Sequence, residues 1–177
     1  MVDFITVDQF EAMDLPDTCD WELHNGTVVS LTFPGFDHIR IQKRLYDIFQ
    51  QSLQNASTGF EVFIELPYRT GVRNDHRADV ALITARQARE DVRTGVLQGS
   101  PVLVIEVLSR SNLPYRMDEL EELCFAHGCE EFWRISTRKL TVEVRNARGR
   151  ATYTVDDVIP VLVPEFSTEI RVRDIFA

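Results

Sequence analysis

Apolar residues recur at two different spacings along this chain, and the two spacings predict different elements of secondary structure. One group recurs at intervals of three and four residues, with polar residues on the opposite face, at Ile41, Leu45, Ile48, Phe49 and Leu53. This spacing predicts an amphipathic helix over residues 37–56. Asp37 is a suitable N-cap for this helix, and His38 falls in its first turn.

Capping residues and apolar spacing predict three further helices. The segments Thr6–Gln9 and Thr84–Gln87 each fit a capping box, in which Thr caps the backbone and Gln reaches back. The first predicts a short helix to about residue 13, and the second opens another helix. Apolar positions from Met117 to His127 predict the last one, which ends at Gly128, a suitable C-cap residue.

Short β-prone runs predict a sheet with two hairpins. Asn25-Gly26 joins two such runs, and this dipeptide is a strong hairpin signal because both residues tolerate positive φ. Alternating apolar and polar residues predict a second hairpin over residues 140–155. Further strands are expected at residues 60–66, 78–83, 102–108 and 131–135, and the third of these reads as a central strand covered on both faces. This order of elements predicts a mixed α/β or α+β fold.

Length and composition fit one soluble domain. A chain of 177 residues with 44% hydrophobic content supports one core of ordinary size, so residues 1–177 are expected to form a single domain. No run approaches the ~20 apolar residues of a membrane helix, and the first residues do not resemble a signal peptide. We therefore expect a cytoplasmic protein without a membrane partner. Cys19, Cys124 and Cys129 lack CxxC spacing, which favours reduced, structural thiols.

The charge balance is acidic, with a formal net charge of -9. This opposes tight, non-specific binding to nucleic acid, because such binding draws its affinity from Lys and Arg. Several arginines nevertheless lie between Arg69 and Arg93. Arginine makes bidentate contacts to phosphate, so a local basic surface is compatible with the acidic total, although solvated helix faces account for most of these residues equally well.

Two acidic residues, Asp79 and Glu106, lie inside apolar strand-like runs. Burying a lone carboxylate costs at least ~2 kcal/mol unless a partner or a cation compensates it. A shared hard divalent cation, held by oxygen atoms, is one explanation for such a pair. Two others stay open: either acid marks a strand end that faces water, or it pairs with a nearby arginine such as Arg77 or Arg110.

An ordered set of motifs extends over nearly the whole chain, at Thr6–Phe10, Trp21–Gly26, Asp37-His38, Arg77–Val80, Val104–Ser109, Gly128–Trp133 and Val163–Phe176. Together these segments resemble the restriction-endonuclease-like superfamily, whose motif is written PD-(D/E)XK. More closely, they resemble the small, stand-alone bacterial endonucleases of the Uma type, formerly a domain of unknown function. No single motif is decisive, but their order and spacing are together fairly specific.

The resemblance implies a fold, an activity and a set of site residues. The fold is a restriction-endonuclease-like core, a mixed central β-sheet flanked by helices, with N-terminal and C-terminal hairpins. The activity is Mg²⁺- or Mn²⁺-dependent hydrolysis of nucleic acid, with DNA as the expected polymer. Asp79 and Glu106 would ligate the metal together with the Val107 carbonyl, while Glu22 and His38 would support catalysis. As alternatives, Glu22 is simply an acid on a hairpin and His38 a residue of a helix N-terminus.

The superfamily's lysine is missing. Glu106 is followed by Val-Leu rather than by a lysine two positions on, and the position where the family carries its lysine on the next helix is Leu120. Losing one such electrostatic donor typically costs about 100- to 1,000-fold in rate. Arg116 or Arg110 could partly replace the charge, and Lys43 is a more distant candidate whose plainer interpretation is a solvated helix-face lysine.

Two alternatives to a working endonuclease follow. The Leu120 substitution and the acidic net charge also fit a catalytically degenerate module that keeps the nuclease fold and binds nucleic acid or protein. A purely structural interpretation makes the second hairpin and the Trp133 region the face of a homodimer. A homodimer is also expected for the nuclease.

Overall fold

A computed structural model of the chain describes residues 4–56, 59–91, 95–109 and 113–177. The helices within these ranges are α1 Val7–Glu11, α2 Phe36–Ala56, α3 Ala85–Asp91, α4 Pro114–Ala126 and α5 Val172–Phe176. The first strands are β1 Trp21–His24, β2 Thr27–Ser30, β3 Phe60–Arg69, β4 Asp75–Thr84, β5 Leu97–Gln98 and β6 Leu103–Leu108. The remaining strands are β7 Glu131–Ser136, β8 Thr141–Asn146, β9 Gly149–Tyr153, β10 Val158–Val163 and β11 Phe166–Arg171.

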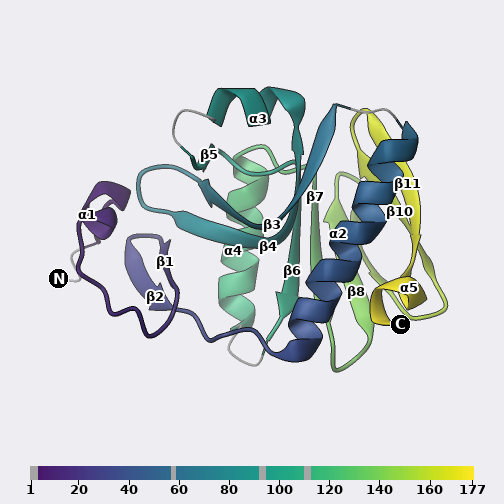
Figure 1. Cartoon of the computed structure of the whole chain (residues 1–177), viewed down its shortest axis with the longest axis horizontal. Coiled ribbons are helices and arrows are strands. Elements are labelled where there is room, and N and C mark those ends of the chain that lie inside the picture. Colours follow the sequence, from purple (N-terminus) through teal and green to yellow (C-terminus); the bar gives the residue numbers. More distant parts are fainter. Residues whose placement is uncertain (1–3, 57–58, 92–94, 110–112) are drawn as a thin grey trace.

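The large sheet is mixed, as predicted. Its strand order is β2-β1-β4-β6-β7-β8-β9, and β3 pairs with both β4 and β5 beside this path (Figure 1). The β6–β7 and β3–β5 pairs are parallel, whereas β4 runs antiparallel to each of its neighbours β1, β3 and β6. Strand β4 therefore joins the N-terminal hairpin to the centre of the sheet.

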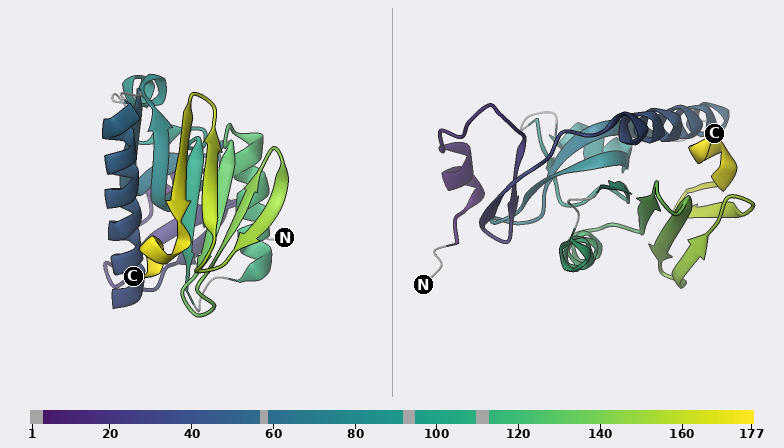
Figure 2. Two further views of the ribbon diagram at one scale, coloured as in Figure 1. Left: turned by 90° about the vertical axis from the view of Figure 1, so that its right-hand side faces the viewer. Right: turned by 90° about the horizontal axis from the view of Figure 1, so that it is seen from below.

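Helices cover the central strands on both faces (Figure 2). On one face, Leu45 and Phe49 of α2 belong to a core cluster that includes Ile105 of β6 and Trp133 of β7. On the other face, α4 packs against residues such as Val104 of β6. Successive residues of β6 thus enter different cores, which confirms a central, doubly covered strand.

Both predicted hairpins are confirmed. In the β1–β2 turn, Asn25 has φ of 48° and Gly26 has φ of 77°, the positive values that such a two-residue hairpin turn requires. A Cβ at Gly26 would lie 2.7 Å from Cβ of Phe4, so this position is also sterically restricted to glycine. The second hairpin is formed by β8 and β9, with Asn146 opposite Gly149.

Two C-terminal elements were not predicted: the β10–β11 ribbon and helix α5. Ile159, Val161 and Phe166 of the ribbon belong to the same core cluster as α2. Pro160 lies within β10, and a proline inside a segment argues against assigning a strand there from the sequence alone. It is tolerated because β10 pairs with β11 alone, so that one side of the strand needs no sheet hydrogen bonds.

The helix predictions are confirmed apart from details at their ends. Both capping boxes form. The Thr6 and Thr84 hydroxyls accept from the backbone N–H of Gln9 and Gln87, and each Gln side-chain oxygen accepts from the backbone N–H of its Thr. The prediction of Asp37 as N-cap of α2 is wrong, because the helix begins at Phe36 and the Gly35 carbonyl already accepts from the Ile39 N–H. Asp37 lies instead in the first turn, where a carboxylate still interacts favourably with the helix dipole.

Three other expectations meet the structure here. Trp133 is buried in the core, so its side chain cannot form part of a dimer face. Cys124 and Cys129 are buried free thiols, as expected of structural cysteines. Among the described helices, none has both the length and the apolar character needed to cross a membrane.

Candidate active site

Three strands place three acidic residues in one row. In the β3–β4 pairing, Ile64 lies opposite Val80 and Leu66 opposite Ala78, which brings Glu65 across from Asp79. In the β4–β6 pairing, Val80 lies opposite Ile105, and the same register continued by one residue brings Asp79 across from Glu106. We call Glu65, Asp79 and Glu106 the acid row.

Asp79 is held in place by three groups on two elements, two on α2 and one on β6. Its Oδ1 lies 2.9 Å from Nε2 of His38 and accepts a 3.1 Å hydrogen bond from Gln42. Its Oδ2 accepts a 2.7 Å hydrogen bond from the Val107 backbone N–H. Arg77 is instead 3.6 Å from Asp20, so the predicted alternative of an Asp79–Arg77 pair is not formed. Arg110 lies outside the described residues.

Glu106 is the least compensated acid of the row. Its Oε1 is buried and has no hydrogen-bond partner among the described residues. Burial raises the pKa of Glu106 well above its usual value, and the nearby charges of Asp79, Glu22 and Glu65 raise it further. This carboxyl therefore sits where a negative charge is disfavoured unless a cation accompanies it.

Glu65 was not predicted from the sequence. It adopts φ of 54°, a left-handed conformation that non-glycine residues rarely adopt and that clusters at functional sites. Its carboxylate accepts a hydrogen bond from Gln42, which therefore bridges Glu65 and Asp79. Burial raises the pKa of Glu65, and repulsion from Asp79 adds to this shift against the opposing Gln42 bond. One signal was available for Gln42: it follows His38 by four residues and so shares its helix face.

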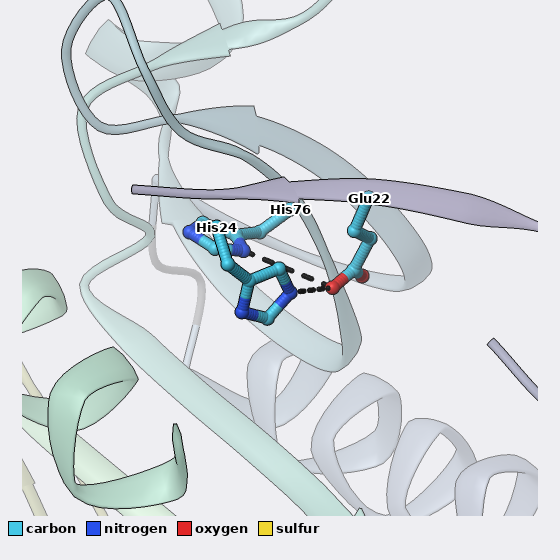
Figure 3. Close-up of side chains that lie close together, drawn as sticks. All are labelled: Glu22, His24 and His76. Carbon is cyan, nitrogen blue, oxygen red and sulfur yellow. Dashed lines mark hydrogen bonds and ion pairs between the residues drawn. The ribbon is translucent and has the colours of Figure 1, made fainter. Parts of the chain in front are cut away.

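Glu22 belongs to a second cluster beside the acid row, together with His24 and His76 (Figure 3). Its Oε2 lies 2.6 Å from His24 Nε2 and 3.8 Å from His76 Nδ1. Its Oε1 accepts a 3.0 Å hydrogen bond from the Arg77 N–H. Burial alone would raise the pKa of Glu22, but the interactions with His24 and His76 outweigh it and lower the pKa to about 2.

All predicted site residues line one pocket. Asp79, Glu106, Val107, Glu22 and His38 are all found in its wall. The wall also contains unpredicted residues, among them Glu65, His24 and His76. The structure thus gathers predicted site residues that are up to 85 positions apart in the sequence, from Glu22 to Val107.

Helix α4 forms one wall of the pocket and includes Leu120, the position at which the family resemblance predicts a lysine. Leu120 lines the pocket at the place where the family's lysine is expected, and Arg116 lines it one turn earlier. Lys43 is not among the lining residues and pairs with Asp47 at 2.6 Å on the exposed face of α2. Its plainer interpretation, a solvated helix-face lysine, is the one that fits.

The fold has a close relative among solved structures. A crystal structure described as that of "a putative nuclease belonging to DUF820" from Anabaena variabilis ATCC 29413 superposes with a TM-score of 0.82, covering 97% of this chain and 97% of that chain at 20% sequence identity. No curated protein matches the chain. At this level of identity the likeness shows that the two chains share one fold over nearly their whole lengths.

A family model gives the more specific assignment. The model Uma2, described as "Putative restriction endonuclease", matches residues 7–172. The chain belongs to this family, as the sequence motifs suggested. The match includes the acid row, the Glu22 cluster and the α4 wall of the pocket.

Proposed function

We propose that this chain is a metal-dependent endonuclease that hydrolyses nucleic-acid phosphodiester bonds, with DNA as the expected polymer and Mg²⁺ or Mn²⁺ as the ion. The observation that carries the proposal is the acid row. Among the described residues, no lysine or arginine lies within ion-pair distance of Glu65, Asp79 or Glu106. Membership of a restriction-endonuclease family supports the same reaction.

The residues present fit a hard divalent cation. Carboxylate and carbonyl oxygens are the ligands such cations prefer, and Mg²⁺ usually needs only one or two carboxylates besides water and substrate phosphate. The partnerless Oε1 of Glu106 is a buried acceptor that a ligand would satisfy. Asp79 and Glu106 would hold the ion, with the Val107 carbonyl as a further ligand. When bound, such an ion polarises a phosphate and makes a bound water easier to deprotonate.

The surrounding side chains position the acids. Gln42 and the Val107 N–H fix the two oxygens of Asp79, so its carboxylate is preorganised. His38 adds a charge that can balance the row: burial lowers its pKa, but the hydrogen bond and the charge of Asp79 outweigh burial and raise it overall. A protonated His38 would thus stand beside an incoming phosphate, while Glu22 would act as a supporting acid.

Exposed aromatic residues that are close in sequence to lining residues of the pocket support nucleic acid as the substrate. Phe33 and Phe36 are 72% and 74% exposed. Phe33 directly precedes the lining residue Pro34 and Phe36 follows it by two positions, with the Arg40 guanidinium 5.6 Å from the Phe36 ring centroid. On the α4 side, Tyr115 is exposed and adjoins the lining residue Arg116. Aromatic rings accompanied by arginine are a common platform for stacking bases.

A specific observation favours a second candidate function. Leu120 places an apolar side chain where the family's lysine would stabilise charge on the phosphate. A chain that binds nucleic acid through the same pocket without turnover would need the acids and the aromatic residues but not the lysine. Arg116, which lines the pocket one turn away, supports residual turnover instead.

Cleavage assays with purified protein test the proposal. Plasmid and single-stranded DNA, with RNA in parallel, are incubated with Mg²⁺, with Mn²⁺ or with EDTA. The wild type should cleave only with a divalent ion, and Asp79→Asn should be about 100- to 1,000-fold slower. The control is Glu169→Gln, which removes an exposed acid of β11 outside the pocket.

The outcomes separate the candidate functions. Equal cleavage by the wild type and Asp79→Asn would assign the activity to a contaminant. Absence of cleavage together with ion-dependent binding of DNA would favour the binding module.

A further inference from the structure

We propose that Glu22, His24 and His76 form a second metal site, selective for Zn²⁺ or a similar late first-row ion and distinct from the acid row. The three side chains come from two strands, β1 and β4. Glu22 and His24 are two residues apart on β1, so their side chains leave the same face. The one paired position, Leu23 opposite Asp75, brings His76 across from Glu22.

The donor atoms already converge without an ion. One ligand atom from each of the three residues lies within 4.8 Å of the others, and Figure 3 shows the rings of both histidines beside the Glu22 carboxylate. His76 Nδ1 lies 3.8 Å from Glu22 Oε2, which is too long for a hydrogen bond. The two imidazole rings meet edge to face, with centroids 4.5 Å apart.

His76 provides an independent sign that a ligand is missing. Its side chain is 3% exposed, and neither ring nitrogen has a hydrogen-bond partner among the described residues. Buried polar atoms in native proteins are nearly always satisfied, so a ring with two unsatisfied nitrogens needs a reason. Burial lowers the pKa of His76, which keeps the imidazole neutral and able to donate a lone pair.

The donor types separate this cluster from the acid row. Two imidazole nitrogens and one carboxylate are a donor set of zinc sites that keep an open position, and imidazole suits zinc far better than magnesium. The acid row offers oxygen donors and one histidine, which suits a hard ion. The Arg77 N–H occupies Oε1 of Glu22 and leaves Oε2 toward the histidines, as an outer-shell donor orients a metal ligand.

Zinc binding by the full chain tests the proposal without nucleic acid. Metal-free protein is titrated with Zn²⁺ by calorimetry and in competition with a chromophoric chelator. The wild type should bind one equivalent, and His24→Gln and His76→Gln should each weaken binding by more than about tenfold, because even the loss of an outer-shell partner costs 10- to 100-fold. His127→Gln is the matched control, since the ring of that exposed histidine bonds only to the Leu123 carbonyl among the described residues.

A further pair of variants assigns the ion to one cluster. Asp79→Asn should bind Zn²⁺ as the wild type does, and Co²⁺-loaded protein should show a visible absorption band that His24→Gln loses. If His76→Gln does not fold, the half-buried His24 carries the test. Wild-type affinity in His24→Gln, or loss of Zn²⁺ binding in Asp79→Asn, would overturn the proposal. The result is independent of the proposed nuclease activity, because no readout depends on cleavage.

Discussion

Two glutamates, Glu106 and Glu121, have buried carboxylate oxygens on neighbouring elements but opposite surroundings. Glu121 of α4 is 1% exposed, yet Arg134 and Arg145 each lie 2.7 Å from its oxygens and Arg150 pairs with it as well. Glu106 of β6 has a buried oxygen with no partner among the described residues. Charged groups seldom leave water unless they are paired, and of these two acids only Glu121 is paired with opposite charges.

Burial of a charged group therefore does not by itself indicate a catalytic or ligand-binding site. Glu121 joins α4 to β7, β8 and β9 through its arginines, which is a structural role. Glu131 is also fully buried, but Trp133, Asn146 and the Leu162 N–H satisfy its oxygens. Glu106, which has one buried oxygen without a donor among the described residues, is the acid that a ligand would satisfy.

The largest expected effect is on turnover in Glu106→Gln. Removing this acid should lower the cleavage rate about 100- to 1,000-fold, the range for losing one preorganised charged group. The free energy of unfolding without metal should stay unchanged or rise, because a disfavoured buried charge is lost. Single-turnover cleavage and urea unfolding measure the two quantities. A variant with both full activity and lower stability would make Glu106 structural.

Glu121→Gln should show the reverse pattern. Its arginines would lose their carboxylate, and breaking a buried pair costs about 3 kcal/mol at the lower end of the usual range. That lower end applies because Arg145 and Arg150 are 28% and 39% exposed and can turn to solvent. Urea unfolding checks the loss, and cleavage per folded molecule should match the wild type. An unchanged free energy of unfolding would refute the structural role.

Leu120→Lys tests whether the lack of a cation beside Glu106 limits turnover. A lysine at this position of the pocket wall would provide the cation that Glu106 lacks, and we expect cleavage to rise about tenfold or more. Leu120→Met is the control, since it keeps the volume and adds no charge. Equal rates for the two folded variants would show that the missing lysine does not limit turnover.

The smallest expected effect is on the pH dependence of stability, measured by urea unfolding in EDTA. The pKa of Glu106 is raised on folding, so the folded state binds more protons and its contribution to stability falls as pH rises above the usual value of 4.5. Glu106→Gln should therefore gain on the wild type as pH rises from about 4.5 to 8.

The contribution of Glu22 to stability changes with pH in the opposite direction. Its pKa is lowered from 4.5 to about 2, so its contribution to stability is present above pH 4.5 and is lost as pH falls toward 2. Glu22→Gln should thus be most destabilised near neutral pH and should approach the wild type in acid. Parallel pH profiles for Glu106→Gln and Glu22→Gln would contradict the assigned surroundings of both acids.

Most of the secondary structure could be predicted from the sequence. The period of apolar residues predicted α2, the Asn25-Gly26 pair predicted the first hairpin, and both capping boxes formed because local hydrogen bonds decide them. The β10–β11 ribbon was missed because Pro160 argues against a strand unless its pairing partners are known. Helix α2 begins one residue before the predicted N-cap Asp37, which is within the usual uncertainty of helix ends.

The site was predictable only where residues broke a local pattern. Asp79 and Glu106 stood out as acids within apolar strands, and Glu22 and His38 came from the family resemblance. Glu65 and His76 gave no such sign. Glu65 lies within the strand-like sequence of β3, and nothing in that sequence indicates its left-handed conformation. The burial of Glu121 could not be predicted either, because this residue belongs to a run of acids on α4 that resembles a solvated face.

The sequence alone was enough to predict most of the helices and strands, a mixed fold and the family, because these depend on local periodicity and on ordered motifs. Only the tertiary structure decided which buried acids have partners. The arginines that neutralise Glu121 lie 13 to 29 positions away from it, and the neighbours that leave Glu106 uncompensated come from β1, β3 and β4. Compensation of charge depends on distances in space, and a linear sequence contains no such distances.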